Sequence, residues 1–211
     1  MRAYSEVMKD WQPWITFVSY LESDGKLRTL YDRIKGPNDN VDNIMMVHSL
    51  RPHSLEGHMA MYKNVLHHTS NSLPKWLLEL TGVYVSLLNT CGYCLEHHFN
   101  GLKRLLRDDA RANAMRSALE NHEFAGVFDA RETAILRYAE ALTKTPSAMT
   151  ESLVQAMREA GLSDGEILEI NQVVSYFAYA NRTVLGLGVT TDGDILGLSP
   201  NASDGDDWKH Q

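Results

Sequence analysis

Apolar residues recur with a helical period along almost the whole chain, and this pattern constrains the fold more than any other feature. The spacing i, i+3, i+4 continues through successive segments separated by glycine and proline, whereas the strict alternation typical of strands is absent. We therefore expect an all-α fold, a multi-helix bundle. The pattern predicts helices over residues 14–23, 26–35, 41–50, 54–70, 74–89, 91–106, 108–121, 131–144, 150–160 and 164–187.

Capping residues mark where several of these helices begin. Asp129 with Glu132, and Ser163 with Glu166, have the spacing of a capping box. Pro74 suits the first turn of the next helix, because a backbone N–H at that position would have no partner within the helix. These signals place three helix starts.

The chain has 211 residues, of which 44% are hydrophobic, and this suits one globular domain. We expect that domain to span residues 1–198. Residues 199–211 are polar, acidic and glycine-containing, so by composition they form a flexible tail. The many apolar helices in a chain of this length also suggest contact between subunits.

Two segments of the chain share a weak internal sequence repeat. The stretch from Glu169 to Asn181 repeats the acidic residue and apolar helix of Glu79 to Cys91, but it ends without cysteine. A bundle of two pseudo-repeated helical halves would explain this repeat. Two buried helices that share a period would explain it equally well.

Charge and hydropathy exclude some classes of partner. The formal net charge is −7 and no stripe of lysine and arginine interleaves with aromatic residues, so nucleic acid is not expected as a partner. No run of about eighteen apolar residues occurs, and the first residues lack the apolar core of a secretory signal. We expect a cytoplasmic protein without a membrane partner, in which a pair of cysteines would cycle between thiol and disulfide.

The only two cysteines form the motif Cys91-Gly92-Tyr93-Cys94, and His98 follows four residues later. The thiolate is the reactive form of cysteine, and a Cys-x-x-Cys motif lowers the pKa of one thiol. A second thiol within reach can resolve a mixed or sulfenic intermediate as a disulfide. The motif therefore favours a redox-active dithiol.

Local geometry strengthens this interpretation. Asn89 and Thr90 suit an N-cap, so Cys91 would lie in the first turn of the helix over residues 91–106. Residues three and four apart share one helix face, which places Cys94 within reach of the His98 imidazole. Unpaired backbone N–H groups at the helix start favour a thiolate. We predict a nucleophilic cysteine here.

Three other interpretations of the pair were weighed. Zinc bound by Cys91, Cys94, His97 and His98 is disfavoured because structural zinc sites usually take ligand pairs from two elements, and His97 points away from the other three. A structural disulfide would close too short a loop to give much stability. Two buried, inert thiols are the third alternative. We expect no metal and no cofactor.

Glu79 is the single acidic residue of the apolar stretch LLELTGVYVSLLN. Such a helix is normally buried. The carboxylate either faces solvent near the helix start or turns inward to orient His98 and take up its proton. Spacing alone leaves both open.

The motif resembles the alkylhydroperoxidase D-like branch of the carboxymuconolactone decarboxylase superfamily, and within it the peroxidase-related enzymes. That family's pattern is a Glu, a Cys-x-x-Cys twelve residues later and a His four residues after the second Cys, and Glu79, Cys91, Cys94 and His98 fit every spacing. The resemblance covers about residues 25 to 200. One departure is Tyr93, where the alkylhydroperoxidase D proteins have a second His.

The resemblance implies a fold, a reaction and an assembly. It implies a multi-helix bundle of the alkylhydroperoxidase D-like type. It also favours the prediction that Glu79 points inward, toward His98. It also implies a thiol peroxidase or dithiol–disulfide oxidoreductase in antioxidant defence, in which Cys94 attacks, Cys91 resolves, His98 is the base and Glu79 orients it. The substrate would be a hydroperoxide or a protein disulfide, the electron donor a thiol or dithiol, and the assembly a homo-oligomer, a trimer or hexamer.

Two alternatives to this function are a decarboxylase-like lyase using His98 and Glu79, and a non-catalytic oligomeric scaffold. The Cys-x-x-Cys pair speaks against the lyase, which would not need it. The pair Asn181-Arg182 resembles one in the peroxidase-related branch and would line the pocket or an interface. His97 is expected to face solvent, as polar helix residues commonly do. The alternative is that it compensates for the second His that the chain lacks before Cys94.

Overall fold

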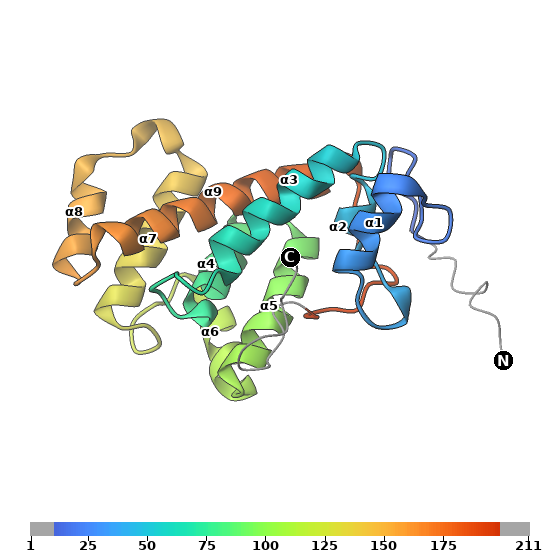
Figure 1. Cartoon of the computed structure of the whole chain (residues 1–211). Helices are drawn as coiled ribbons and strands as arrows, with labels where there is room; N and C mark the ends of the chain where they lie inside the picture. Colours follow the sequence, from blue (N-terminus) through green and yellow to red (C-terminus); the bar gives the residue numbers. More distant parts are fainter. Residues whose placement is uncertain (1–10, 199–211) are drawn as a thin grey trace.

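The computed structural model describes residues 11–198, in which all the regular secondary structure is helical (Figure 1). This confirms the all-α prediction, and the predicted tail lies outside the described residues. The α-helices are α1 (Gly25–Ile34), α2 (Asn43–Met46), α3 (Pro52–Tyr62), α4 (Lys75–Leu88), α5 (Gly92–Leu106), α6 (Asp109–Asn121), α7 (Ala130–Lys144), α8 (Glu151–Glu159) and α9 (Asp164–Leu187). Two 3-10 turns, η2 (Pro37–Asp39) and η4 (Pro146–Ala148), and a π-helical turn, η3 (Lys63–His67), lie between them.

The predicted helix starts are close to the observed ones. Both capping boxes form: an Asp129 carboxylate oxygen accepts the N–H of Glu132 at 2.8 Å, and Ser163 Oγ accepts the N–H of Glu166 at 3.3 Å. Pro74 is the N-cap residue of α4, one position before the predicted first turn. The long helix α9 covers the whole predicted stretch.

The prediction of a helix over residues 14–23 is wrong. The Tyr31 hydroxyl donates to the Val18 carbonyl at 2.8 Å, and the Val18 N–H donates to Ser49 Oγ at 2.8 Å. These tertiary hydrogen bonds take the place of a helical ladder, so the segment runs as bends and turns. The stretch predicted over 41–50 holds only the one-turn helix α2, and that over 54–70 divides into α3 and η3.

Helix α4 lies at the centre of the core and positions the site. Every residue from Leu77 to Ser86 is buried, and α4 packs against α5, α7 and α9 (Figure 1). Gly82 allows the closest of these approaches, because a Cβ there would lie 2.1 Å from the Phe177 ring of α9. Glu79 is therefore carried into the interior by its own helix.

The two ends of the described chain meet beside α5 and α9. The Asn43 amide donates to the carbonyls of Thr190 and Asp192 at 2.8 and 3.1 Å, and Trp11 Nε1 donates to Gly188 O at 3.1 Å. Helices α1 to α3 thus form a wall opposite α5, with a cavity between. Among residues 11–198, no helix combines the length and apolarity needed to cross a bilayer. The two-half repeat stays a prediction.

Candidate active site

A tight turn between α4 and α5 presents the two cysteines. Thr90 has a left-handed backbone, with φ +55°, and the Cys91 N–H donates to the Ser86 carbonyl at 2.9 Å. Cys91 is the N-cap residue of α5, which begins at Gly92, so the helix starts one residue later than predicted. The Cys91 sulfur consequently lies over the first N–H groups of the helix.

The two sulfurs are unoxidised, buried and hydrogen-bonded to each other. The hydrogen bond from Cys94, together with the N–H groups of Cys94 and Tyr93, lowers the pKa of Cys91. The hydrogen bond to Cys91 and burial hold the pKa of Cys94 well above its ordinary value. Cys91, at the helix start, is thus the thiol of the pair that ionises more easily, and Cys94 keeps its proton to higher pH.

Asn181 of α9 is the residue that the sequence interpretation undervalued. Its side chain is fully buried and hydrogen-bonds to Cys94, which partly offsets the raised pKa of that thiol. It is held in place by Ser86 Oγ at 3.2 Å and by the Asn89 amide at 2.9 Å. The resemblance of the pair Asn181-Arg182 was the only signal for it. Arg182 is exposed and donates to the carbonyl of Ala178.

Glu79 turns inward, as the resemblance implied. Its side chain is 1% exposed, and Oε2 lies 2.7 Å from His98 Nδ1. The second oxygen, Oε1, lies 3.9 Å from Nε2 of His67, and neither atom has a hydrogen-bond partner among the described residues. One buried carboxylate therefore lies between two imidazoles.

His98 is near the dithiol but not bonded to it. Its ring packs against Phe177 with centroids 4.5 Å apart, and it lines the same cavity as Cys94. Within residues 11–198, no hydrogen bond joins the His98 ring to either sulfur. The predicted transfer of a proton from Cys94 to His98 stays a prediction.

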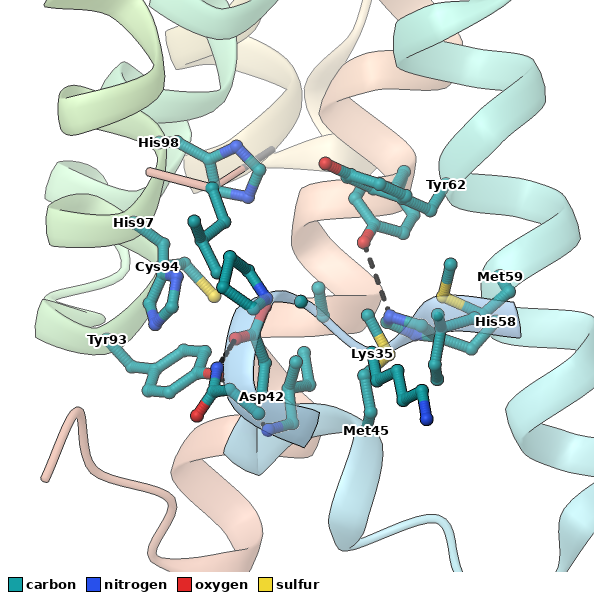
Figure 2. Close-up of a pocket in the computed structure, with 18 of the residues that line it drawn as sticks. Lys35, Asp42, Met45, His58, Met59, Tyr62, Tyr93, Cys94, His97 and His98 are labelled. Atoms are coloured by element: carbon teal, nitrogen blue, oxygen red, sulfur yellow. Dashed lines mark hydrogen bonds between the residues drawn. The ribbon is translucent and has the colours of Figure 1, made fainter. Parts of the chain in front are cut away.

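A cavity of about 530 Å³ opens in front of Cys94 (Figure 2). Cys94, His97 and His98 of α5 lie on one wall, and His58, Met59 and Tyr62 of α3 lie on the opposite wall. Cys91 does not line it. The remaining lining residues come from three regions of the chain: Ile34, Lys35, Gly36, Pro37, Asn40, Asp42, Ile44 and Met45 near α1 and α2; Tyr93 and Arg104 of α5; Tyr176, Ala180 and Leu198 at or after α9.

His58 is the most deeply buried imidazole in that lining. Burial lowers its pKa to about 3, so the ring is neutral. Nε2 contacts the Tyr176 hydroxyl at 3.5 Å, while Nδ1 has no partner among the described residues. The lining thus combines apolar and aromatic side chains with polar and charged ones, among them Lys35, Asp42 and Arg104, and such a mixture can hold a small organic molecule.

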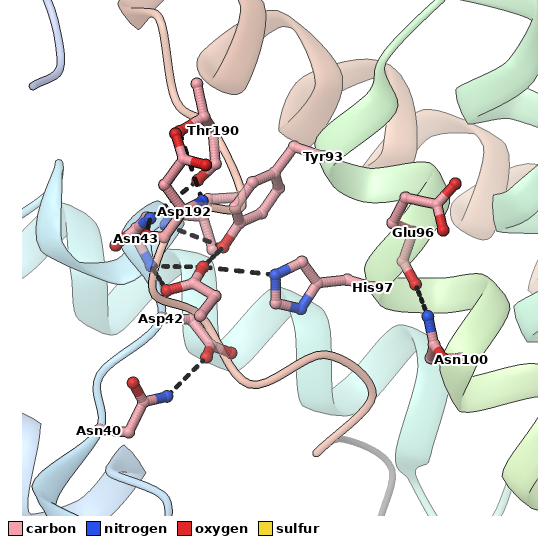
Figure 3. Close-up of polar contacts among 11 residues, drawn as sticks. Asn40, Asp42, Asn43, Tyr93, Glu96, His97, Asn100, Thr190 and Asp192 are labelled. Carbon is pink, nitrogen blue, oxygen red and sulfur yellow. Dashed lines mark hydrogen bonds and ion pairs between the residues drawn. The ribbon is translucent and has the colours of Figure 1, made fainter. Parts of the chain in front are cut away.

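His97 is turned inward, so the expectation that it faces solvent is wrong. Its side chain is 12% exposed, its Nε2 lies 3.3 Å from Asp194 Oδ2, and its ring lies 4.5 Å from that of Tyr93 (Figure 3). The cause is the chain after α9, which folds back over α5 and brings Asp194 to it. No three His, Cys, Asp or Glu side chains within residues 11–198 are arranged to hold a metal ion.

No protein-family model matches the chain, and no curated protein matches it. Among solved structures, the alkylhydroperoxidase AhpD core of an uncharacterized peroxidase-related protein from Ralstonia eutropha is similar, with a TM-score of 0.75 and 19% identity over 88% of this chain and 95% of that one. An uncharacterized peroxidase-related protein from Silicibacter gives a TM-score of 0.68 and 23% identity over 80% and 87% of the two chains.

A third solved structure is a variant of the debrominase Bmp8 in complex with 2,3,4-tribromopyrrole. It gives a TM-score of 0.66 and 15% identity over 86% of this chain and 95% of that one. At these identities the similarity concerns the fold. The chain therefore has the all-α fold of the alkylhydroperoxidase D-like, peroxidase-related proteins.

Proposed function

We propose that the protein is a dithiol-dependent peroxidase that reduces organic hydroperoxides. The observation that carries this proposal is a pair of free, hydrogen-bonded thiols at a helix start, one of which, Cys94, lines a cavity. A vicinal dithiol can deliver two electrons without a cofactor. Cys94 is the attacking sulfur because Cys91 is fully buried and does not reach the cavity.

The reaction proceeds in two steps on this geometry. The Cys94 thiolate attacks the terminal peroxide oxygen, so that an S–O bond forms, the O–O bond breaks and the alcohol leaves. Cys91 then attacks the Cys94 sulfur, an intrachain disulfide forms, and the sulfenic oxygen leaves as water with the second thiol proton. Hydroperoxide and two thiols yield alcohol, water and disulfide, which an external thiol or dithiol reduces.

The proton of Cys94 must leave before the attack. Cys91, Asn181 and the helix start stabilise negative charge on the sulfur pair. His98 is the nearby base of this proposal, and Glu79, at 2.7 Å, orients the ring and stabilises the imidazolium. Glu79 is a positioning residue here, because it acts through His98.

The cavity favours an organic substrate over hydrogen peroxide. A volume of about 530 Å³ lined by Met45, Met59, Tyr62 and Tyr176 far exceeds what two oxygen atoms need. Reductive removal of halogen from an aromatic ring is a second candidate, because it would use the same two electrons and because a debrominase in complex with 2,3,4-tribromopyrrole has a similar fold. The lyase and the scaffold rank behind these, since neither uses the thiol pair.

Assembly and location are part of the same proposal. Several large apolar side chains, Trp14, Leu21 and Leu168 among them, are exposed on the described surface. Contact between copies would cover them, and we propose a homo-oligomer, a trimer or hexamer. A reducing compartment such as the cytoplasm would supply the electron donor.

Stopped-flow mixing of the reduced protein with cumene hydroperoxide and with hydrogen peroxide tests the function. Cumene hydroperoxide should react faster and consume two thiols per chain, and mass spectrometry should show the loss of two hydrogens within one chain. Cys94→Ser should abolish the reaction, whereas Cys91→Ser should accumulate a sulfenic acid on Cys94 that dimedone traps. Unchanged thiols in the wild type would overturn the proposal, and dimedone labelling of Cys91 in Cys94→Ser would reverse the roles.

A further inference from the structure

A second carboxylate–imidazole pair faces the cavity beside the first. His97 Nε2 lies 3.3 Å from Asp194 Oδ2, at ion-pair distance but without a hydrogen bond among the described residues, whereas Glu79 Oε2 is hydrogen-bonded to His98 Nδ1 at 2.7 Å. The carboxylates come from different parts of the chain, Glu79 from α4 and Asp194 from the segment after α9. Since only Glu79 belongs to the motif, the pattern of the sequence does not reveal the second pair.

Asp194 is built into its place. Its side chain is fully buried and accepts the Tyr93 hydroxyl at 2.8 Å and the Asn43 N–H at 3.0 Å. The Tyr93 hydroxyl in turn accepts the N–H of Ile44 at 3.2 Å. A buried carboxylate held by α2 and α5 has a fixed position, so its contact with His97 is a defined feature of the site.

His97 and His98 flank the reacting cysteine. They lie three and four residues after Cys94 on α5, the two positions that neighbour it on a helix surface, and all three line the cavity. Because Nε2 of His97 is buried beside Asp194, at 3.3 Å, we take Nδ1 to be the nitrogen that meets a bound molecule. The cavity thus holds two imidazoles, each with its own carboxylate, next to one sulfur.

We propose that His97, held by Asp194, is the catalytic proton donor to the alkoxide leaving group. This inference rests on the proposed peroxidase function. When the O–O bond breaks, an alkoxide leaves, and an alkoxide is a poor leaving group unless it is protonated as it forms. In this proposal His98, paired with Glu79, accepts the thiol proton, and His97, beside Asp194, protonates the leaving oxygen.

The protons balance across the cycle. The Cys94 proton passes through His98 to solvent, and the His97 imidazolium gives a proton from Nδ1 to the alkoxide, which leaves as the alcohol. His97 then regains a proton from solvent, and water leaves with the proton of Cys91. The sum remains hydroperoxide and two thiols to alcohol, water and disulfide.

The groups that surround His97 suit a proton donor. Asp194 faces it from the chain after α9, and the Tyr93 ring stacks on it from α5. Asp42, just before α2, and Arg104, further along α5, line the same cavity. Burial and the nearby Asp194 and Asp42 carboxylates hold the pKa of Tyr93 well above its ordinary value, so its proton stays on the phenol. Of the Tyr93 phenol and the His97 ring, His97 is therefore the proton donor of this proposal.

Leaving-group dependence tests the inference directly. Peracetic acid reacts by the same attack but expels acetate, a weak base that needs no proton, whereas cumene hydroperoxide expels a strongly basic alkoxide. His97→Phe keeps the ring stack on Tyr93 and removes both nitrogens. We expect it to lose about 10²-fold in rate with cumene hydroperoxide, the lower end of what a positioned proton donor contributes, and to keep the wild-type rate with peracetic acid within a few-fold.

Two further variants keep the inference falsifiable. Asp194→Asn should show the same selective loss to a smaller degree, and His53→Gln, on the exposed face of α3, should change neither rate. If His97→Phe fails to fold, His97→Gln gives the same comparison. An equal loss with both oxidants, or no loss, would overturn the role of His97 while leaving the peroxidase intact. A wild type inert to both oxidants would instead refute the proposed function.

Discussion

The chemistry of this protein lies in a few pairs of side chains. The hydrogen bond between Cys91 and Cys94, together with the backbone N–H groups at the helix start, lowers the pKa of Cys91, while the same bond and burial raise the pKa of Cys94. Glu79 is almost fully buried, and a buried carboxylate is costly unless it is hydrogen-bonded. His98 meets that need on one oxygen, with His67 near the other. Such an arrangement is typical of functional sites.

Glu79→Gln isolates the role of that carboxylate. The amide keeps the shape of the side chain but removes the negative charge that stabilises the His98 imidazolium. We expect hydroperoxide consumption to fall by about 10²-fold, in the range usual for a positioned acid–base group, while circular dichroism shows an unchanged fold. Glu96→Gln on α5, the helix that carries His98, is the matched control, because the Glu96 carboxylate pairs with Arg116 at 3.0 Å instead. A wild-type rate in Glu79→Gln would remove Glu79 from the mechanism.

At the scale of elements, the packing of two helices, α4 and α9, fixes the positions of the side chains in the site. Helices α4 and α9 approach so closely that Phe177 fills the space over Gly82, and the same ring contacts His98 on α5 at 4.5 Å. Helix α9 also carries Asn181 to Cys94. The distance between α4 and α9 therefore decides where the His98 ring lies relative to the sulfurs.

Gly82→Ala should disturb fold and activity together. The added Cβ would lie 2.1 Å from the Phe177 ring, so this ring, which also packs against His98, must shift. Overpacking of this kind typically costs about 1–3 kcal/mol in the free energy of unfolding, which urea denaturation would measure, and the peroxidase rate should fall as well. Gly57→Ala in α3 meets open space and should stabilise the protein by up to about 1 kcal/mol. Equal stability of the two variants would contradict this account of α4–α9 packing.

At the scale of the whole molecule, several histidines are buried and have lowered pKa values. Desolvation lowers the pKa of His48, lowers that of His58 to about 3 and lowers that of His67 to about 4. His58 and His67 are therefore neutral in the folded protein. His58 lines the cavity and packs against His48, and His67 lies beside the Glu79 carboxylate. An aromatic layer that includes Tyr62, Tyr176 and Phe177 packs among them.

The stability of the protein should depend on pH through these rings. In the unfolded chain a histidine takes up a proton near pH 6.5, whereas His58 and His67 do so only near pH 3 and 4 in the folded state. Stability is therefore complete above about pH 6.5 and falls as the pH drops below it, by about 1.4 kcal/mol per pH unit for each such group. Urea denaturation at pH 7.5, 6.0 and 5.0 measures the fall.

Two variants distinguish the contribution of a buried histidine to this pH dependence from that of an exposed one. His58→Phe should reduce the slope with pH, because its ring cannot titrate in either state. His53→Phe, at an exposed position on α3, should leave the slope unchanged. Stability that is constant between pH 7.5 and 5.0 would show that the buried imidazoles are not held neutral.

The sequence by itself determined the local features of this protein. Capping boxes and the helical period predict the ends of α7 and α9, and the spacing of Cys91, Cys94 and His98 predicts their shared face, because neighbours within one helix follow from a fixed rise and turn. The spacing of Glu79 left open whether the carboxylate faces inward. The resemblance decided for the interior, and the 2.7 Å contact with His98 agrees.

Only the tertiary structure decided the contacts between distant segments. Asn181 reaches Cys94, Asp194 reaches His97, and tertiary hydrogen bonds of Val18 keep residues 14–23 out of a helix. Each contact depends on how closely helices pack and where the chain returns, and these result from the whole core. Periodicity within one segment carries no information about them, since it records which face is buried and not what buries it.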